Sequence, residues 1–509
     1  MLEGTKRALM AVTAAGLVLS APLPAAPARN VVAQQPMCRR AAPLPILPAE
    51  QTRRQQQNFD GPTPPPVMMA PPPAPPPPPP DTVAPAPVSP GGDAIVTGTR
   101  IPRPSLESSS PVTVVGSADA AARSEPSGFA PERDRGSPQS GQLTAGEHDD
   151  LLNPELYANY VAAFQSGQQM VGVPRVDTGR VLTVVAQDRA GRPIPFARVT
   201  LTCADGNSLS LSTLADGSVA FFPALDRLGS RVRLSVAAPG RAASPARFVS
   251  ISSEPGAQRQ SVTLAAPAAA IAKFDLAVVV DVTGSMGDEL EYLKSELRSI
   301  LDALKRGHPG LDIRLSLVAY RDEGDEFVTR TFPFTPSLGQ MQTSLRAQSA
   351  GGGGDYPEAM DQALARAVGQ GWRPDAVKSL LLVADAPPHD ENIGKTWRAV
   401  EAARAKRIQI VPVAASGVGD TAEYIMRAMA AATQSRYIFL TDDSGIGNPH
   451  APPAIDCYLV TRLDTMVRRV LDSQISGRRV EPRAGEIIRT VGQYEGGRCV
   501  LPPNYGQEQ

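Results

Sequence analysis

The sequence is poor in the residues on which many binding sites and scaffolds depend. Four cysteines and four histidines in 509 residues are too sparse for a zinc scaffold. Aromatic residues make up 5%, with two tryptophans, which argues against a platform that stacks bases or sugars. Fifty Lys and Arg against 51 Asp and Glu give a formal net charge of −1, so no global field attracts nucleic acid. We therefore expect no nucleic-acid partner.

Proline, by contrast, is abundant. The 52 prolines are about twice the average usage, and nine of them fall within residues 71–80. Residues 29–148 have no sustained helical or strand period and are dominated by Pro, Ala, Ser and Arg, which predicts a disordered or extended arm. The proline tract is typical of polyproline II, so it would serve as a stiff spacer.

The first 28 residues predict a secretory signal peptide. Lys6 and Arg7 precede an apolar run, Ala8 to Leu19, which small residues and prolines follow. The run is shorter than the about 20 residues that a membrane span needs. We expect cleavage after Ala28, no transmembrane segment afterwards, and export to the periplasm, to the outer membrane or out of the cell.

An oxidising compartment would permit disulfides. Cys457 and Cys499 either form a bridge that attaches the C-terminal tail, residues 477–509, to the preceding domain, or remain free thiols, because spacing does not decide connectivity. Cys203 lies in an apolar strand pattern, so we expect it to be a small buried hydrophobic residue.

Residues 93–115 form a distinct stretch of the arm, beginning with the sequence DAIVTGTRIPRP. The stretch resembles the TonB-box region of TonB-dependent outer-membrane receptors. This resemblance implies contact of residues 93–101 with the energy-transducing partner by strand addition. The alternative is a β-prone segment without a partner. No pattern of barrel strands follows, so transport is not expected.

Two smaller units precede the last domain. Residues 149–172 predict a short amphipathic helix and a linker. Residues 179–266 alternate in short strands separated by Gly and Asp turns, which predicts an all-β sandwich. Its segments DRAGRPIP, ARV and ADG resemble those of immunoglobulin-like modules related to the regulatory domain of carboxypeptidases. This resemblance implies that the sandwich serves as a spacer or a docking surface.

Residues 272–476 predict a doubly wound α/β domain. The apolar run Phe274–Val280 has the length of a buried strand and is followed by DVTGSMG and by a helical pattern. Further strand and helix patterns alternate as far as residue 475, where Tyr458–Ile475 predicts a final amphipathic helix. The polar loop that begins at Asp281 then lies at the carboxyl end of a strand, where open α/β sheets bind ligands.

Three separated pieces of this domain resemble the von Willebrand factor type A domain and its metal-ion-dependent adhesion site. Asp281, Thr283 and Ser285 are similar to the family's Asp-x-Ser-x-Ser motif. Asp355, in the sequence GGGGDYPEA, stands in the second loop, where many members supply a threonine, and Asp385 ends a later strand. The resemblance implies a Rossmann-like fold and one divalent ion, Mg²⁺ or Mn²⁺, bound by these five residues.

The chemistry of such a site is coherent. Mg²⁺ prefers six oxygen ligands at about 2.0–2.1 Å and often keeps several waters. In the family, an open coordination position accepts an acidic residue of a protein ligand. With Asp355 as a third carboxylate the dication would be more than neutralised, so its attraction for an acidic ligand would weaken. Alternatively Asp355 points away and a water replaces it, or the carboxylates only cap helices and no metal binds.

Nearby polar residues have simpler interpretations. Asp288, Glu289 and Glu358 are expected to serve helix starts. The acidic stretch 321–326 predicts a solvated turn that borders the metal face. His389 is expected to be a hydrogen-bonded surface residue.

The sequence thus predicts an exported protein that binds a protein ligand through a metal ion and is not an enzyme. One alternative is a cell-envelope scaffold, or a TonB-coupled accessory protein, with a non-functional metal site. A weaker one is an aspartyl-phosphate phosphotransferase, because DVTGS also resembles the phosphorylation loop of ion-pumping ATPases. That chemistry needs a second Gly-Asp motif, and Gly419-Asp420 matches it poorly.

Overall fold

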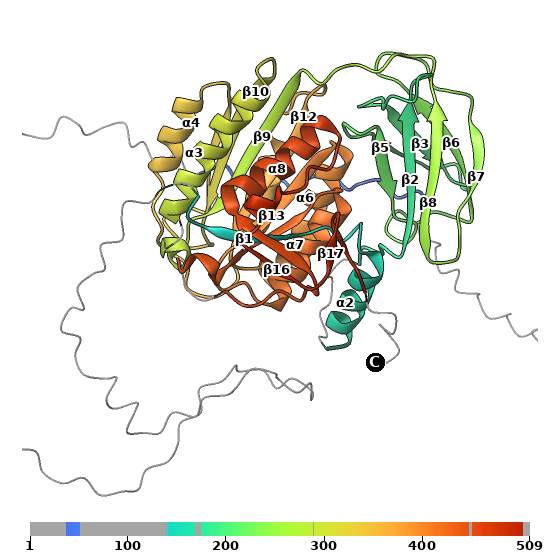
Figure 1. Cartoon of the computed structure of the whole chain (residues 1–509). Coiled ribbons are helices and arrows are strands. Elements are labelled where there is room, and N and C mark those ends of the chain that lie inside the picture. The colour runs from blue at the N-terminus through green and yellow to red at the C-terminus, as the bar shows by residue number, and fades with distance from the viewer. Residues whose placement is uncertain are drawn as a thin grey trace, which may run out of the picture.

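The computed structural model describes residues 37–50, 139, 141–167, 175–288, 290–446 and 450–501 (Figure 1). The predicted signal peptide, the proline tract and the TonB-box-like segment 93–115 lie outside the described residues. No helix in the described part of the chain has the length and apolar character needed to cross a membrane.

A nine-stranded mixed sheet forms the centre of the larger part of the molecule. Its order is β11 (Thr329–Thr335), β10 (Asp312–Tyr320), β9 (Lys273–Asp281), β12 (Val377–Ala384), β13 (Ile408–Ala414), β14 (Tyr437–Thr441), β1 (Thr144–His148), β15 (Tyr458–Arg462) and β16 (Arg489–Val491). Strands β10, β9, β12, β13 and β14 are mutually parallel, and the other four join by antiparallel pairing. This arrangement agrees with the predicted α/β class.

Helices cover both faces of this sheet, and strand β9 shows why. Its side chains alternate between two cores: Leu276, Val278 and Val280 contact one, and Ala277 and Val279 the other. The first core contains residues of α3 (Leu290–Gly307), α4 (Leu338–Arg346) and α8 (Leu463–Ser476). The second contains residues of α5 (Met360–Gly369), α6 (Ile393–Ala405) and α7 (Asp420–Ala432).

Strand β1 corrects the expected extent of the disordered arm. Residues 144–148 were expected to belong to the arm that ends at residue 148, but they pair with β14 on one side and with β15 on the other. Gly146 makes this fit possible, because a Cβ there would lie 2.3 Å from the Phe439 ring and 3.0 Å from the Tyr458 ring. A strand of five residues between two partners is specified by its neighbours rather than by its own pattern.

The C-terminal elements also differ from the prediction. The expected helix over residues 458–475 begins only at Leu463, because residues 458–462 form β15. Residues 489–491 of the expected tail add β16 to the sheet, and β17 (Tyr494–Glu495) pairs with β18 (Arg498–Cys499). The disulfide Cys457–Cys499 joins this tail to the sheet, so the bridged alternative is the one found.

The all-β part consists of two sheets that share one core (Figure 1). Their orders are β5-β2-β8 and β4-β3-β6-β7, with β2 (Arg180–Gln187), β3 (Arg198–Thr202), β4 (Ser208–Ser212), β5 (Ser218–Phe221), β6 (Arg231–Ala237), β7 (Arg247–Ser250) and β8 (Gly256–Thr263). Helix α2 (Pro154–Gly167) precedes them and contacts α7 by stacking of Phe164 on Tyr424. The resemblance to carboxypeptidase regulatory modules remains a prediction.

Residues 37–50, which we call the strap, connect the two parts. The disulfide Cys38–Cys203 attaches the strap to the all-β part, so the expectation that Cys203 is a plain hydrophobic residue is wrong. Arg39 forms an ion pair with Glu401 on α6, and Glu50 accepts a hydrogen bond from Thr329 on β11 at 3.1 Å. Residues 37–50 therefore belong to the folded body and not to the expected arm.

Candidate functional site

The common direction of two neighbouring strands brings two of the predicted metal-binding carboxylates together. Asp281 is the last residue of β9, and Asp385 follows directly after β12, the neighbouring parallel strand. Both side chains are buried. Because the two strands run in the same direction, their carboxyl ends meet at one edge of the sheet, as the sequence predicted.

The Asp-x-Thr-x-Ser motif forms a compact hydrogen-bonded turn. Oδ1 of Asp281 accepts hydrogen bonds from the backbone N–H and the hydroxyl of Thr283, at 2.9 and 2.7 Å. The Thr283 hydroxyl lies 3.2 Å from that of Ser285, which is exposed. Oδ2 of Asp281 is buried without a geometrically acceptable hydrogen bond, although the Tyr320 hydroxyl lies close to this carboxyl. The motif thus presents an oxygen that lacks a partner beside two hydroxyls.

Burial and mutual repulsion perturb this carboxyl. Burial raises the pKa of Asp281, and the nearby charge of Asp385 raises it further, to about 7. Two carboxylates that are buried beside each other are stabilised by a positive charge that both can contact, and a divalent cation supplies such a charge.

A run of glycines, residues 351–354, forms the second loop beside the motif. Gly284 donates a backbone hydrogen bond to the carbonyl of Gly352, and Gly351 one to that of Val282, both at 3.1 Å. Gly352 has φ of 81°, and a Cβ there would lie 2.4 Å from the carboxylate of Asp325. Only glycine fits both the left-handed backbone and this close approach.

Asp355 and Glu358 lie differently from what the sequence indicated. Asp355 is exposed at a bend after the glycines. Glu358 is 3% exposed and does not cap a helix, because the cap position of α5 is Ala359 and has no side-chain hydrogen bond. Burial, followed by the charges of Asp281 and Asp322, raises the pKa of Glu358 to about 9. Glu358 is therefore a member of the site that the sequence reasoning missed.

The acidic stretch 321–326 borders the site, as expected, but it is not wholly solvated. Asp322 is buried and pairs with His389 at 2.7 Å. Burial lowers the pKa of His389, but the hydrogen bond and charge of Asp322 outweigh this and raise it. Oδ2 of Asp325 accepts a hydrogen bond from the backbone of Gly353 at 2.8 Å and so holds the glycine loop. A loop has no regular alternation of apolar and polar residues, so its sequence does not predict these contacts.

Tyr356 is a further residue without a sequence signal. The residue is 46% exposed at the rim of the site, while its hydroxyl lies 3.2 and 3.1 Å from the carbonyls of Asp385 and Gly417, which share its single proton, and accepts from Gly419 N–H at 2.6 Å. An exposed, fixed aromatic ring is the kind of side chain that anchors a protein partner.

Among the described residues, no three His, Cys, Asp or Glu side chains come together closely enough to bind a metal by themselves. The donor set at this edge is of another kind: two carboxylates, Asp281 and Asp385, with the hydroxyls of Thr283 and Ser285. Carboxylate and hydroxyl oxygens completed by water are ligands that Mg²⁺ accepts. The residues therefore fit the cation that the sequence predicts.

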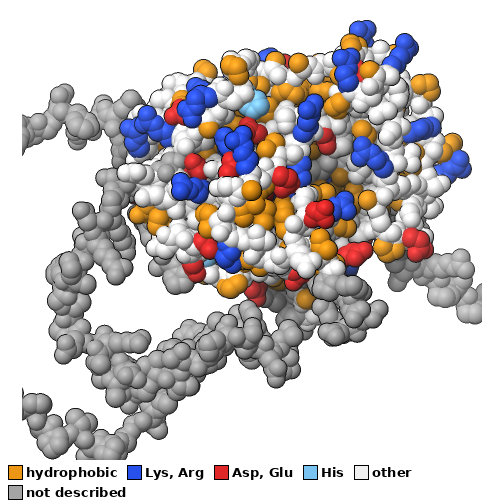
Figure 2. Space-filling model, in the orientation of Figure 1, with side chains coloured by type: hydrophobic (Ala, Val, Ile, Leu, Met, Phe, Trp, Pro, Cys, Tyr) orange, Lys and Arg blue, Asp and Glu red, His pale blue; other side chains and the backbone are white. Residues whose placement is uncertain are grey.

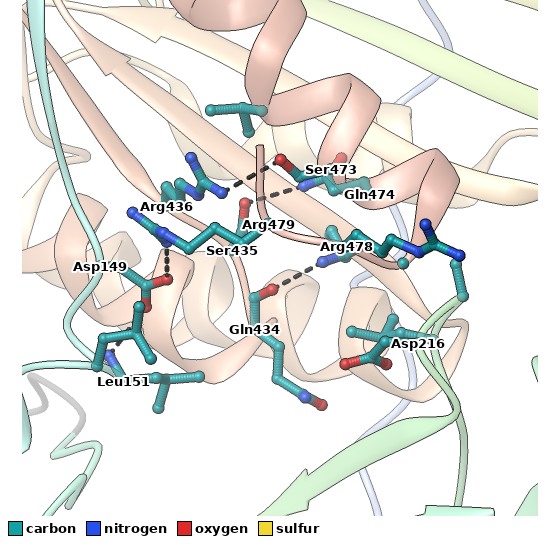
Figure 3. A pocket seen from close by; sticks show the side chains of 16 residues that line it. Asp149, Leu151, Asp216, Gln434, Ser435, Arg436, Ser473, Gln474, Arg478 and Arg479 are labelled. Atoms are coloured by element: carbon teal, nitrogen blue, oxygen red, sulfur yellow. Dashed lines mark hydrogen bonds and ion pairs between the residues drawn. The ribbon is translucent and has the colours of Figure 1, made fainter. Parts of the chain in front are cut away.

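A separate cavity of about 260 Å³ lies at the opposite end of the sheet. Gln409 at the start of β13 and Arg436 just before β14 line it, so it lies at the amino ends of the parallel strands. Figure 3 shows Arg436 among the labelled residues of its wall. Asp216, from the all-β part, and Arg479, which pairs with Asp149, complete its wall. This cavity marks the junction of the two parts and is remote from Asp281.

Residues 275–448 match the family model of the von Willebrand factor A domain. This part of the chain is therefore similar to the von Willebrand factor A domain. The match covers β12 and all of β9 from Asp275 onward, and with them Asp281, Asp385 and the loops between these strands. It leaves out β1, β15 and β16, which complete the sheet in this chain.

Two curated proteins share part of this sequence. The alpha-protein kinase vwkA of Dictyostelium discoideum is 35% identical over 117 residues, which are 23% of this chain and 19% of that protein. An ariadne-like RING finger protein of Acanthamoeba polyphaga mimivirus is 34% identical over 124 residues, 24% of this chain and 12% of that protein. The chain thus spans a fifth or less of the length of these relatives.

Two solved structures are also similar. The conserved hypothetical protein BatB of Bacteroides thetaiotaomicron aligns with 40% of this chain and 98% of its own, at 13% identity and a TM-score of 0.28. An aerotolerance-related membrane protein of Bacteroides fragilis aligns with 40% of this chain and 99% of its own, at 12% identity and a TM-score of 0.29.

Proposed function

We propose that this protein binds a protein partner through a divalent cation, Mg²⁺ or Mn²⁺, held by its von Willebrand factor A domain. The observation that carries the proposal is the buried Oδ2 of Asp281, which has no hydrogen-bond partner and lies in a turn with the hydroxyls of Thr283 and Ser285. A buried carboxylate oxygen without a partner costs about 1–3 kcal/mol or more, which a bound cation would offset.

Each residue has a defined part in this proposal. Asp281 and Asp385 would provide negative charge, and Thr283 and Ser285 would provide hydroxyl oxygens, with Asp355 as the ligand expected from sequence. When bound, the cation would supply an open coordination position for an oxygen of the partner, such as an acidic residue. Tyr356, fixed at the rim through its hydroxyl, would contribute apolar contact area beside that position.

The proposed setting is outside the cytoplasm. Both disulfides, Cys38–Cys203 and Cys457–Cys499, support export, because such bonds persist in oxidising compartments, and together they use all four cysteines of the chain. The proposal applies equally to a protein in the periplasm, at the outer-membrane surface or secreted from the cell. The protein would act by binding and not as an enzyme, and the all-β part would act as a spacer.

Thermal unfolding of the full chain with EDTA, Mg²⁺ or Mn²⁺ tests the cation site. We expect either metal to raise the midpoint, because a ligand at one hundred times its Kd stabilises by about 2.7 kcal/mol. Asp281→Asn should abolish the response. Asp302→Asn, on the outer side of α3 with only a 4.0 Å pair to Arg298, is the matched control and should retain it. No metal response in the parent would refute the proposal and favour the cell-envelope scaffold.

A further inference from the structure

We propose that Glu358, and not Asp355, supplies the third carboxylate of the cation site. The inference rests on the proposed function and deepens it, since it names a ligand that neither the motif nor the family match assigns. It depends on three features of Glu358: where its backbone is fixed, where its carboxyl points, and what that carboxyl lacks.

The backbone of Glu358 is fixed to the loop that carries Asp385. Its N–H donates to the carbonyl of Pro387 at 2.9 Å, and the residue forms an isolated parallel bridge with Pro388. Helix α5 begins two residues later, at Met360. Glu358 is therefore held beside one of the two metal-binding loops by main-chain contacts that do not involve its side chain.

The side chain extends toward the other metal-binding loop. A Cβ built on Gly353 would lie 2.9 Å from Oε1 of Glu358 and 3.4 Å from Cβ of Thr283. The carboxyl of Glu358 and the side chain of Thr283 thus meet over the same glycine. Glu358 spans the gap between the Asp385 loop and the Asp281 motif, which is where a cation shared by these loops would lie.

One oxygen of the Glu358 carboxyl is also left without a hydrogen-bond partner. The residue is 97% buried and its Oε2 forms no hydrogen bond in the described structure. A buried carboxyl with a free oxygen, aimed into a group of like charges, is costly unless a cation compensates it. Among the described residues, the three carboxyls do not lie close enough together to hold a metal, so the proposal requires the Glu358 side chain to move toward the cation when it binds.

Asp355 differs from Glu358 in its burial. It is exposed, and it lies beyond the glycine loop, where its charge acts on His389. With Glu358 as third carboxylate, Asp281, Asp385 and Glu358 together more than neutralise a dication. The chain would then bind the cation before a partner arrives, which makes the site measurable with the metal alone.

The test is Mn²⁺ binding to the full chain, followed by the electron paramagnetic resonance signal of the free ion. Glu358→Gln and Asp355→Asn form a matched pair, since each replaces one carboxylate of the same loop with its amide. We expect Glu358→Gln to weaken Mn²⁺ affinity about tenfold or more, as loss of a ligand requires, and Asp355→Asn to change it by less than about threefold.

A second measurement guards against a folding defect. In EDTA, Glu358→Gln should unfold at a temperature close to that of the parent, because glutamine keeps the length and shape of the side chain and brings no charge into the buried site. Weakened Mn²⁺ binding by Asp355→Asn with unchanged binding by Glu358→Gln would overturn the inference and leave the proposed function intact. A lower unfolding temperature of Glu358→Gln in EDTA would assign the residue a structural role and would also overturn the inference. A parent that binds no Mn²⁺ would refute both.

Discussion

Glu147, on strand β1, is an anion enclosed by two arginines. Its Oε2 accepts a hydrogen bond from Arg436 at 2.8 Å, and its Oε1 one from Arg469 at 2.9 Å. All three side chains are buried, with Glu147 2% exposed. Burial alone would raise the pKa of Glu147, but Arg436 and Arg469 outweigh this effect and lower it to about 2.

Replacing Glu147 by glutamine should therefore destabilise the fold strongly. The change leaves two buried guanidinium groups without a counter-charge, which we expect to cost about 3–5 kcal/mol of unfolding free energy. Urea denaturation followed by circular dichroism measures this loss. Glu155→Gln, on the exposed side of α2, is the control and should be nearly neutral. Equal stability of both variants would contradict this account.

The lowered pKa of Glu147 should also make the stability of the fold depend on pH in the acidic range. The folded-state pKa of about 2 lies below the ordinary value of 4.5, so Glu147 stabilises the fold above pH 4.5. That contribution, about 3 kcal/mol from the size of the shift, should be lost as the pH falls from about 4.5 to about 2. Unfolding free energies across this range should therefore fall less steeply in Glu147→Gln than in the parent. Parallel slopes would argue against the depressed pKa.

At the scale of elements, β1 decides how the sheet is completed. The strand precedes the all-β part in the chain, yet it pairs with β14 (Tyr437–Thr441) and β15 (Tyr458–Arg462), whereas the last strand of the all-β part ends at Thr263. Such distant pairing closes a long loop, and it gains its stability only when both neighbouring strands are in place. The all-β part is thus inserted within the chain of the sheet.

Gly146 provides a test of this pairing. Gly146→Ala would place a methyl group within 2.3 Å of the Phe439 ring, so we expect a loss of about 1–3 kcal/mol from overpacking. Gly310→Ala is a matched control, because a Cβ there meets nothing within 4 Å. Chemical denaturation of the two variants distinguishes them. An unaffected Gly146→Ala variant would show that β1 does not occupy this place.

At the scale of the whole molecule, the strap ties the two parts together. Its disulfide with Cys203 lies on the all-β part, while Leu44 and Leu47 pack on the core that α5, α6 and α7 share. Glu50 reaches the edge strand β11. The visible surface of the folded body mixes charges of both signs, so no single-sign patch marks a charged partner there (Figure 2).

Cys38→Ser should loosen the strap at its first anchor. Arg39 and Arg40 follow Cys38 directly, and we expect trypsin to cleave after them faster in the variant, because local opening exposes the backbone. Limited proteolysis with mass spectrometry measures the rate. Cys457→Ser, which removes the other disulfide, should leave this cleavage unchanged. An unaltered rate in Cys38→Ser would mean that the ion pair of Arg39 holds the strap by itself.

The sequence by itself determined the α/β core and the motif of the candidate site. Apolar runs such as Phe274–Val280 specify buried parallel strands, and polar residues directly after them fall at one sheet edge whatever the rest of the chain does. Asp281, Thr283 and Ser285 are local in sequence, so their hydrogen-bonded turn follows from their spacing.

Only the tertiary structure decided the remaining features, because they depend on contacts between residues far apart in the chain. Strand β1 has no pattern of its own that separates it from the arm, and Cys38 meets Cys203 across a separation of 165 residues. Glu358 and Asp355 are three positions apart and chemically alike, yet packing buries the first and exposes the second. Side-chain burial of this kind is set by the partners that surround a loop, which periodicity does not encode.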